Sequence, residues 1–159
     1  MVGSHAELFD SIREDVLTRL VEVRGSIDHA YATVAEDVIR EQFCVVLDKM
    51  RSYLVTQNPD LYRSFATRWL AMRTGQGFAP ENIIHSMVAL GNVVSDVAKA
   101  RFGPTPEYFS FARAMAHLNF VATRMLVELL AEEVKRRSEQ HNMLSRKAPA
   151  QKTLMEFGK

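Results

Sequence analysis

The chain has 159 residues, of which 47% are hydrophobic and 25% are charged, and its 20 Lys+Arg against 19 Asp+Glu leave a formal net charge of +1. This length and composition are typical of one globular domain with a hydrophobic core. The near-neutral charge disfavours a general polyanion binder, and the single cysteine, Cys44, excludes a disulfide scaffold. No 18-residue apolar run and no signal-peptide pattern occur, so we expect a cytoplasmic protein without a membrane span.

The first third of the chain reads as two helices. Apolar residues four apart predict a helix over residues 5–24: Leu8, Ile12, Val16 and Leu20. A second helix is expected to start at Asp28, a good N-cap residue, and to end near Thr56, and its length allows a kink or a break within it. Its apolar residues form two adjacent stripes: Tyr31, Val34, Val38 and Val45 beside Ile39, Phe43, Val46 and Met50.

Proline and glycine divide the rest of the chain into three more helices. The third is expected to begin at Pro59 and to end at Gly75. Its predicted buried stripe consists of Leu61, Phe65, Trp69 and Met72. The fourth and fifth start at Pro80 and Pro106, and the fifth could run to about His141.

All the predicted elements are helices, because no segment alternates apolar and polar residues for long enough to predict a strand. Five helices joined by short loops predict an all-α bundle, in which a globin-like arrangement is allowed. We expect a helical domain over residues 1–142 and a flexible basic tail over residues 143–159. The tail has a net charge of +3, which leaves about −2 for the rest of the chain.

The tail contains the order Gln-x-x-Leu-x-x-Phe, which peptides that dock on sliding clamps use. The residues that would fill the clamp pockets are Gln151, Leu154, Met155 and Phe157. The second aromatic residue of such peptides is missing, because residue 158 is a glycine. Three interpretations stay open: a clamp-docking peptide, an unspecific short linear anchor, and a frayed chain end.

None of the common catalytic or metal-binding motifs is present. The five histidines lie on separate segments without HExxH or paired ExxH spacing, so we expect no metal and no cofactor. There is no GxSxG, P-loop or SxxK sequence, so no catalytic residue is predicted and the chain is not expected to be an enzyme. Cys44 lies among apolar residues, which favours a small buried side chain over a reactive thiol.

Two groups of residues are candidates for binding. His85, Asn92 and Asp96 share one polar edge of the fourth helix, which is either solvated or faces another subunit. A pocket for a ligand or cofactor is the second candidate, between four large side chains: Phe65, Trp69, Met87 and Met115.

The basic residues of the helices do not predict a nucleic-acid interface. Arg63, Arg68 and Arg73 are five residues apart, so they spread around the third helix rather than forming one stripe. The run 135–137 is basic and follows acidic residues at the end of a long helix, where cations complement the helix dipole. We therefore expect these side chains to be solvated.

The turn between the third and fourth helices is the most distinctive part of the sequence. It reads Arg73-Thr74-Gly75-Gln76-Gly77-Phe78-Ala79-Pro80-Glu81-Asn82-Ile83. This segment resembles the R-x-x-QG-[FV]-x-x-[ED]-x-[IL] turn in the helical N-terminal domains of bacterial stressosome proteins of the RsbR class (RsbT co-antagonists), and similar segments occur in PucR-type regulators. The resemblance covers about residues 22–130, but only the turn is specific.

The resemblance implies a helical, partly globin-like sensory or protein-interaction domain that is often dimeric, normally lacks haem and has no catalytic residues. We therefore expect a non-enzymatic bacterial signalling module that forms a homodimer and binds a protein partner. Two alternatives stay open. One is a small-molecule or cofactor sensor that uses the predicted pocket, and the other is a clamp- or nucleic-acid-associated factor that acts through the tail.

Overall fold

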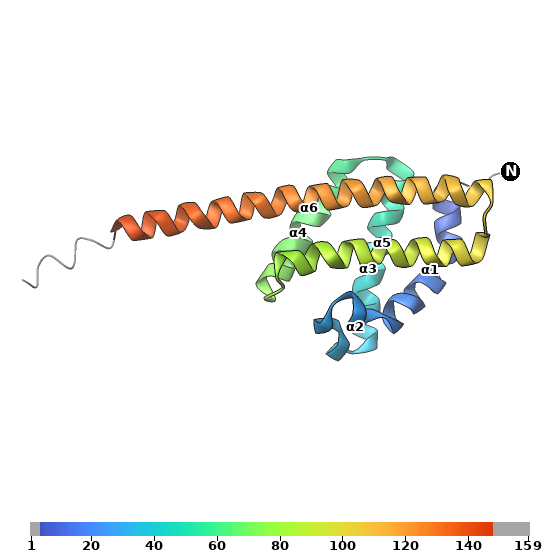
Figure 1. Ribbon diagram of the computed structural model, residues 1–159, viewed down its shortest axis with the longest axis horizontal. Coiled ribbons are helices and arrows are strands. Elements are labelled where there is room, and N and C mark those ends of the chain that lie inside the picture. Colours follow the sequence, from blue (N-terminus) through green and yellow to red (C-terminus); the bar gives the residue numbers. More distant parts are fainter. Residues whose placement is uncertain (1–3, 148–159) are drawn as a thin grey trace, which may run out of the picture. The chain divides into compact units, whose positions relative to one another are not determined.

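A computed structural model describes residues 4–147 of the chain (Figure 1). Every regular element in this range is a helix: α1 (His5–Glu22), α2 (Arg24–Ile27), the 3-10 helix η1 (His29–Thr33), α3 (Glu36–Thr56), α4 (Pro59–Gly75), α5 (Pro80–Phe102) and α6 (Pro106–Lys147). The predicted all-α fold is confirmed. The chain forms two compact units, Met1–Leu126 and Val127–Lys159, so the division falls within α6.

Local side-chain signals explain where several helices begin. Ser4 and Glu7 form a capping box at the start of α1, in which each side chain accepts the other residue's backbone N–H. The Asn58 side chain accepts a backbone N–H at the start of α4, ahead of Pro59 in the first turn. Thr105 caps α6 in the same way. The predicted starts of α4, α5 and α6 therefore agree with the structure.

The helix expected from Asp28 to Thr56, for which the length allows a kink or a break, is broken into η1 and α3. The Asp28 carboxylate accepts the N–H of Ala30 and caps η1, and the chain is extended at Val34 before α3 begins. The break brings Tyr31 against Phe43, with ring centroids 5.9 Å apart. In one straight helix these residues would lie about 18 Å apart along the axis. The break therefore allows the Tyr31 ring to be buried beside α3.

The buried faces of α3 and α4 differ from the predicted stripes. α3 buries Ile39, Phe43, Val46 and Met50 but leaves Val38 and Val45 exposed. α4 packs against α3 and α5 through a face centred on Ala66, so Leu61 and Met72 fall at its exposed edges. The buried residues of α4 are Tyr62, Phe65, Ala66, Trp69, Leu70 and Arg73.

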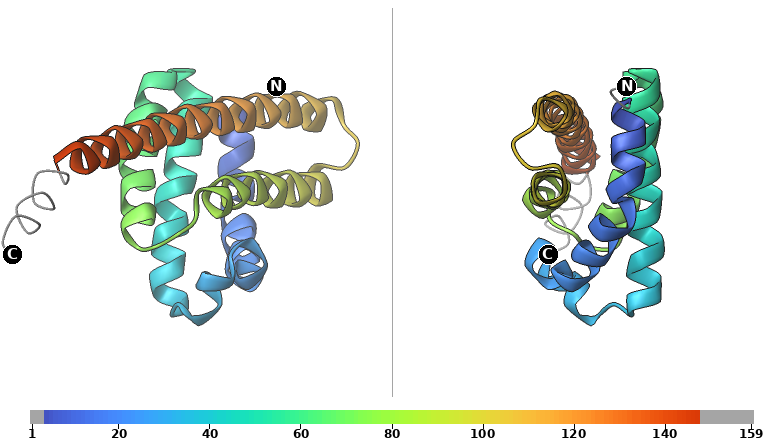
Figure 2. Two further views of the ribbon diagram at one scale, coloured as in Figure 1. Left: turned by 60° about the vertical axis from the view of Figure 1, so that its left-hand side comes forward. Right: turned by 90° about the vertical axis from the view of Figure 1, so that its right-hand side faces the viewer.

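The core of the first unit lies around α1, which packs against both α3 and α5, while α4 runs antiparallel to α3 (Figure 2). Gly91 of α5 and Asn119 of α6 approach so closely that a Cβ at position 91 would lie 2.0 Å from Asn119 Nδ2. Only glycine allows this approach without a shift of Asn119. The largest side chains that are fully buried include Phe9, Ile12, Leu20, Ile39, Leu47, Leu90 and Phe111.

The helix α6 is longer than predicted. It has 42 residues and continues to Lys147, beyond the expected end near His141 and across the predicted domain boundary at residue 142. One 18-residue window of α6 is long and apolar enough to cross a membrane by length and composition, and 33% of that window is buried. The core helix of a soluble protein meets the same criterion, so the expected absence of a membrane span stays a prediction.

Candidate functional site

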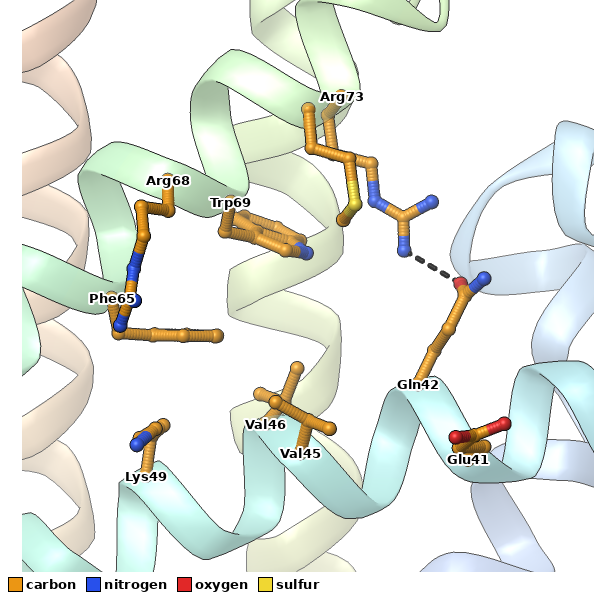
Figure 3. A pocket seen from close by; sticks show the side chains of 10 residues that line it. Glu41, Gln42, Val45, Val46, Lys49, Phe65, Arg68, Trp69 and Arg73 are labelled. Atoms are coloured by element: carbon orange, nitrogen blue, oxygen red, sulfur yellow. Dashed lines mark hydrogen bonds between the residues drawn. The ribbon is translucent and has the colours of Figure 1, made fainter.

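A pocket of about 510 Å³ opens between α3 and α4 (Figure 3). Its volume lies in the range of small-molecule sites. Its apolar lining consists of Val45, Val46, Phe65, Trp69 and Met72. Its polar lining consists of Glu41, Gln42, Lys49, Arg68 and Arg73. Each helix contributes side chains three, four or seven residues apart, which is the spacing that places them on one face.

Arg73 is the most unusual residue of the pocket, because only 5% of its surface is exposed. Its guanidinium carbon lies 5.0 Å from the ring centroid of Tyr31, 5.1 Å from that of Phe78 and 5.8 Å from that of Trp69. These distances are within the range of cation–π attraction. Three aromatic rings therefore surround a buried positive charge.

The hydrogen bonds of Arg73 go to neutral amides. Nη2 donates to Gln42 Oε1 at 2.9 Å, and Nη1 donates to Gln76 Oε1 at 3.2 Å. Nε is buried and has no acceptor within the part of the chain that the structure describes. No carboxylate of residues 4–147 lies within ion-pair distance of Arg73. The charge is thus partly solvated by rings and amides but has no counter-ion there.

The turn after α4 holds this arrangement in place. The backbone N–H of Phe78 donates to the carbonyl of Arg73 at 3.0 Å, which folds the Phe78 ring back over the guanidinium. Gly77 has a φ of 86°, a conformation that favours glycine. Arg73, Gln76, Gly77 and Phe78 are residues that carry the resemblance noted in the sequence. In the structure, Gln76 and Phe78 contact Arg73, and Gly77 forms the turn between them.

The pocket is electropositive. Arg68 and Lys49 line it with Arg73, and one lining residue, Glu41, is acidic. Burial raises the pKa of the Tyr31 phenol above its ordinary value, although the nearby Arg73 acts in the opposite direction. Tyr31 is therefore a neutral phenol at pH 7 and does not neutralise Arg73.

Sequence reasoning missed Arg73 as a site residue, and the expectation that it is solvated is wrong. Arg73 lies four residues after Trp69 and seven after Ala66, so it falls on the buried face of α4. The expectation rested on the five-residue spacing of three arginines, which ignores their position relative to the apolar stripe. The spacing of Arg73 from Trp69 is the signal that could have found it.

The predicted pocket residues are only partly brought together. Phe65 and Trp69 line the α3–α4 pocket, whereas Met87 and Met115 are fully buried elsewhere and do not line it. The hydroxyl of Tyr62 donates to Met87 Sδ at 3.4 Å, which places this methionine in the packed core. The four side chains therefore do not share the α3–α4 pocket.

The remaining candidate residues are dispersed. His85, Asn92 and Asp96 are exposed on α5 and share one edge, as their spacing predicts. Cys44 is half-buried rather than fully buried. The tail residues Gln151, Leu154, Met155 and Phe157 lie outside the described residues.

In the described part of the chain, no three His, Cys, Asp or Glu side chains gather in a way that could hold a metal ion. The residues of the α3–α4 pocket could hold a ligand, and their chemistry suits an anion with an apolar part. Compared with known protein families, curated protein sequences and solved structures, the chain matches none of them.

Proposed function

We propose that the chain is a non-enzymatic interaction module of a signalling pathway, which forms a homodimer through α6 and binds a protein partner. The observation that carries the proposal is a second apolar stripe on α6. Phe120, Val127 and Val134 are seven residues apart and 65%, 50% and 62% exposed. A different face of the same helix carries buried residues, among them Met115, Leu118 and Ala122.

A seven-residue spacing matches the contact seam between two supercoiled helices. The occupant that fits such a seam is a second copy of α6, because a homodimer interface is self-complementary. The charges favour an antiparallel order. Acidic residues precede Val134 and basic residues follow it: Glu128, Glu132 and Glu133 against Lys135, Arg136 and Arg137. In two antiparallel copies related by an axis near Val134, each acidic segment lies beside the partner's basic segment.

The resemblance of residues 73–83 to the RsbR-class turn supports the same proposal, since those helical domains are sensory or interaction modules that are often dimeric. The protein partner and the signalling pathway are inferred from that resemblance alone. The cytoplasmic location and the absence of enzymatic activity are part of the proposal.

The proposal is tested by the oligomeric state of the whole chain. Light scattering after gel filtration should give twice the 18.1 kDa of one chain. Val134→Lys should give a monomer with an unchanged helical spectrum, because a lysine in the seam must be desolvated. Met143→Lys is the matched control, since Met143 is 61% exposed but lies on another face of α6. A wild-type monomer at high concentration, or a dimer of Val134→Lys, contradicts the proposal.

The antiparallel orientation of the two α6 helices in the proposed dimer is tested separately. In a Cys44→Ala background, Val134→Cys should be joined to its symmetry mate by a short bis-maleimide. Val127→Cys should not be joined, because antiparallel copies separate these two positions. Joining of both variants would establish a parallel dimer and correct the proposed order.

A further inference from the structure

We propose that the pocket between α3 and α4 binds a small organic carboxylate. Its carboxylate pairs with Arg73 at the inner end, its apolar body lies against Phe65 and Trp69, and Arg68 and Lys49 at the rim add positive charge that attracts it. The site goes beyond the interaction function proposed above, because all its residues belong to α3 and α4 and none of them lies on α6.

The charge of Arg73 is the first argument. A buried cation costs free energy unless it is paired and hydrogen-bonded. Aromatic rings attract the guanidinium but accept no N–H bond in its plane, and the amides of Gln42 and Gln76 engage two of its five donors. The buried Nε is left without an acceptor in the described chain. A carboxylate supplies both the missing charge and the missing acceptors in a geometry that a guanidinium matches.

The rim of the pocket provides the second argument. Arg68 and Lys49 line the same pocket from opposite helices, and neither has a carboxylate within ion-pair distance among residues 4–147. Figure 3 places Glu41 beside Gln42, at the end away from Arg68 and Lys49. Three cations and one carboxylate therefore line a single small pocket, so it attracts anions.

The apolar lining defines the rest of the ligand. The rings of Phe65 and Trp69 are stacked, with centroids 6.5 Å apart and an angle of 22° between their planes. Val45 and Met72 are half-exposed and extend this wall toward the solvent. Inorganic phosphate has no apolar part, so it would leave these apolar side chains in contact with water. A carboxylate with a flat or aliphatic body covers them and gains apolar burial as well as charge pairing.

Trp69 makes binding visible, because it is the only tryptophan of the chain and lines the pocket. Titration of the full-length protein with benzoate and with octanoate should change the tryptophan fluorescence in a saturable way and raise the melting temperature. Benzamide and octanamide have the same bodies without the charge and should bind at least about tenfold more weakly, since a charge-assisted hydrogen bond is lost. Amides that bind as well as the carboxylates would overturn the proposal.

Variants at the rim test the residues while leaving the core alone. Arg68→Gln and Lys49→Gln should each weaken benzoate binding about twofold to threefold, because each removes one positive charge that attracts the carboxylate. Val45→Phe should abolish it by filling the pocket from a half-exposed position. Arg101→Gln is the matched control, because it removes one positive charge from the exposed end of α5, and it should bind like the wild type. Equal binding by the rim variants and the control would contradict the proposed site.

Arg73→Gln tests the inner end of the pocket, with circular dichroism as the check that the variant folds. If it folds, benzoate binding should fall more than in either rim variant. Inorganic phosphate serves as the second probe. A saturable fluorescence change with phosphate equal to that with benzoate would show a site for inorganic anions and overturn the assignment of an organic carboxylate.

Discussion

Arginines join helices in two regions of the first unit, and only one of the two regions supplies them with carboxylates. On the α1–α3 surface, each arginine meets a carboxylate: Arg13 with Asp48, Arg40 with Glu14 and Arg51 with Asp10. In the α3–α4 pocket, Arg73 meets three rings and two amides. The paired arginines of the α1–α3 surface are accessible to water, whereas Arg73 is buried.

Exposed, paired arginines and the buried Arg73 differ in their effect on the stability of the fold. Exposed ion pairs add little to stability because water already solvates both charges. A buried guanidinium without a counter-ion is costly, so its neighbours must be arranged around it or an anion must come from outside. The α1–α3 arginines have their counter-ions within the chain, whereas Arg73 has none among the described residues.

Arg73→Ala should produce the largest effect. It removes the side chain from among three rings and leaves the oxygens of Gln42 and Gln76 without their donor, so the free energy of unfolding should fall by about 2–4 kcal/mol. Urea unfolding followed by circular dichroism measures this. Arg68→Ala on the same helix is exposed and should change the value by under about 0.5 kcal/mol. Similar losses in both variants would remove the contrast between buried and exposed arginines.

Gln42→Glu should make the pocket resemble the α1–α3 surface. It places a carboxylate where the amide oxygen lies 2.9 Å from Arg73 Nη2. At pH 7 the free energy of unfolding should rise by about 1 kcal/mol, and benzoate binding should weaken about tenfold because the charge is already neutralised. Chemical unfolding and the Trp69 titration measure the two effects. Unchanged benzoate binding would show that charge pairing at Arg73 is not what holds the ligand.

Asp10→Asn should have a smaller effect, under about 1 kcal/mol, because the Asp10 carboxylate is exposed. The hydrogen bond from Arg51 is the main reason why the pKa of Asp10 lies below its ordinary value, so the pair stabilises the fold above that value. The stability difference between wild type and variant should therefore persist at neutral pH and disappear as the pH falls below the ordinary aspartate range. A difference that grows in acid would contradict this sign.

Glu133→Gln should have the smallest effect. Hydrogen bonds from Arg136 and Arg137 lower the pKa of the Glu133 carboxyl to about 2. These contacts within α6 persist above the ordinary glutamate pKa and are lost as the pH falls toward about 2. The helical signal of the wild type should therefore decrease more in this acid range than that of the variant. Far-UV circular dichroism of the two proteins in parallel measures the difference, and identical acid profiles would contradict it.

Much of the fold could be predicted because its signals are local. Asn58-Pro59 and Thr105-Pro106 start helices by capping, and the periodicity of apolar residues excludes strands. The length of the segment 28–56 allows a break, but its position between Asp28 and Glu36 could not be predicted, because it depends on where Tyr31 packs rather than on a glycine or proline at the break. Of the site, Phe65 and Trp69 were predicted from their size and spacing, while Arg73 and Gln42 were not.

The amino-acid sequence by itself determined the all-α class and most helix starts, since caps, prolines and helical periodicity act within a few residues. Only the tertiary structure decided which face of each helix is buried. That decision depends on packing between segments far apart in the chain, and it turned Arg73 from an expected surface charge into a buried one. The pairing of Arg73 with Gln42, Tyr31 and Phe78 joins three segments, and no pattern within any one of them contains it.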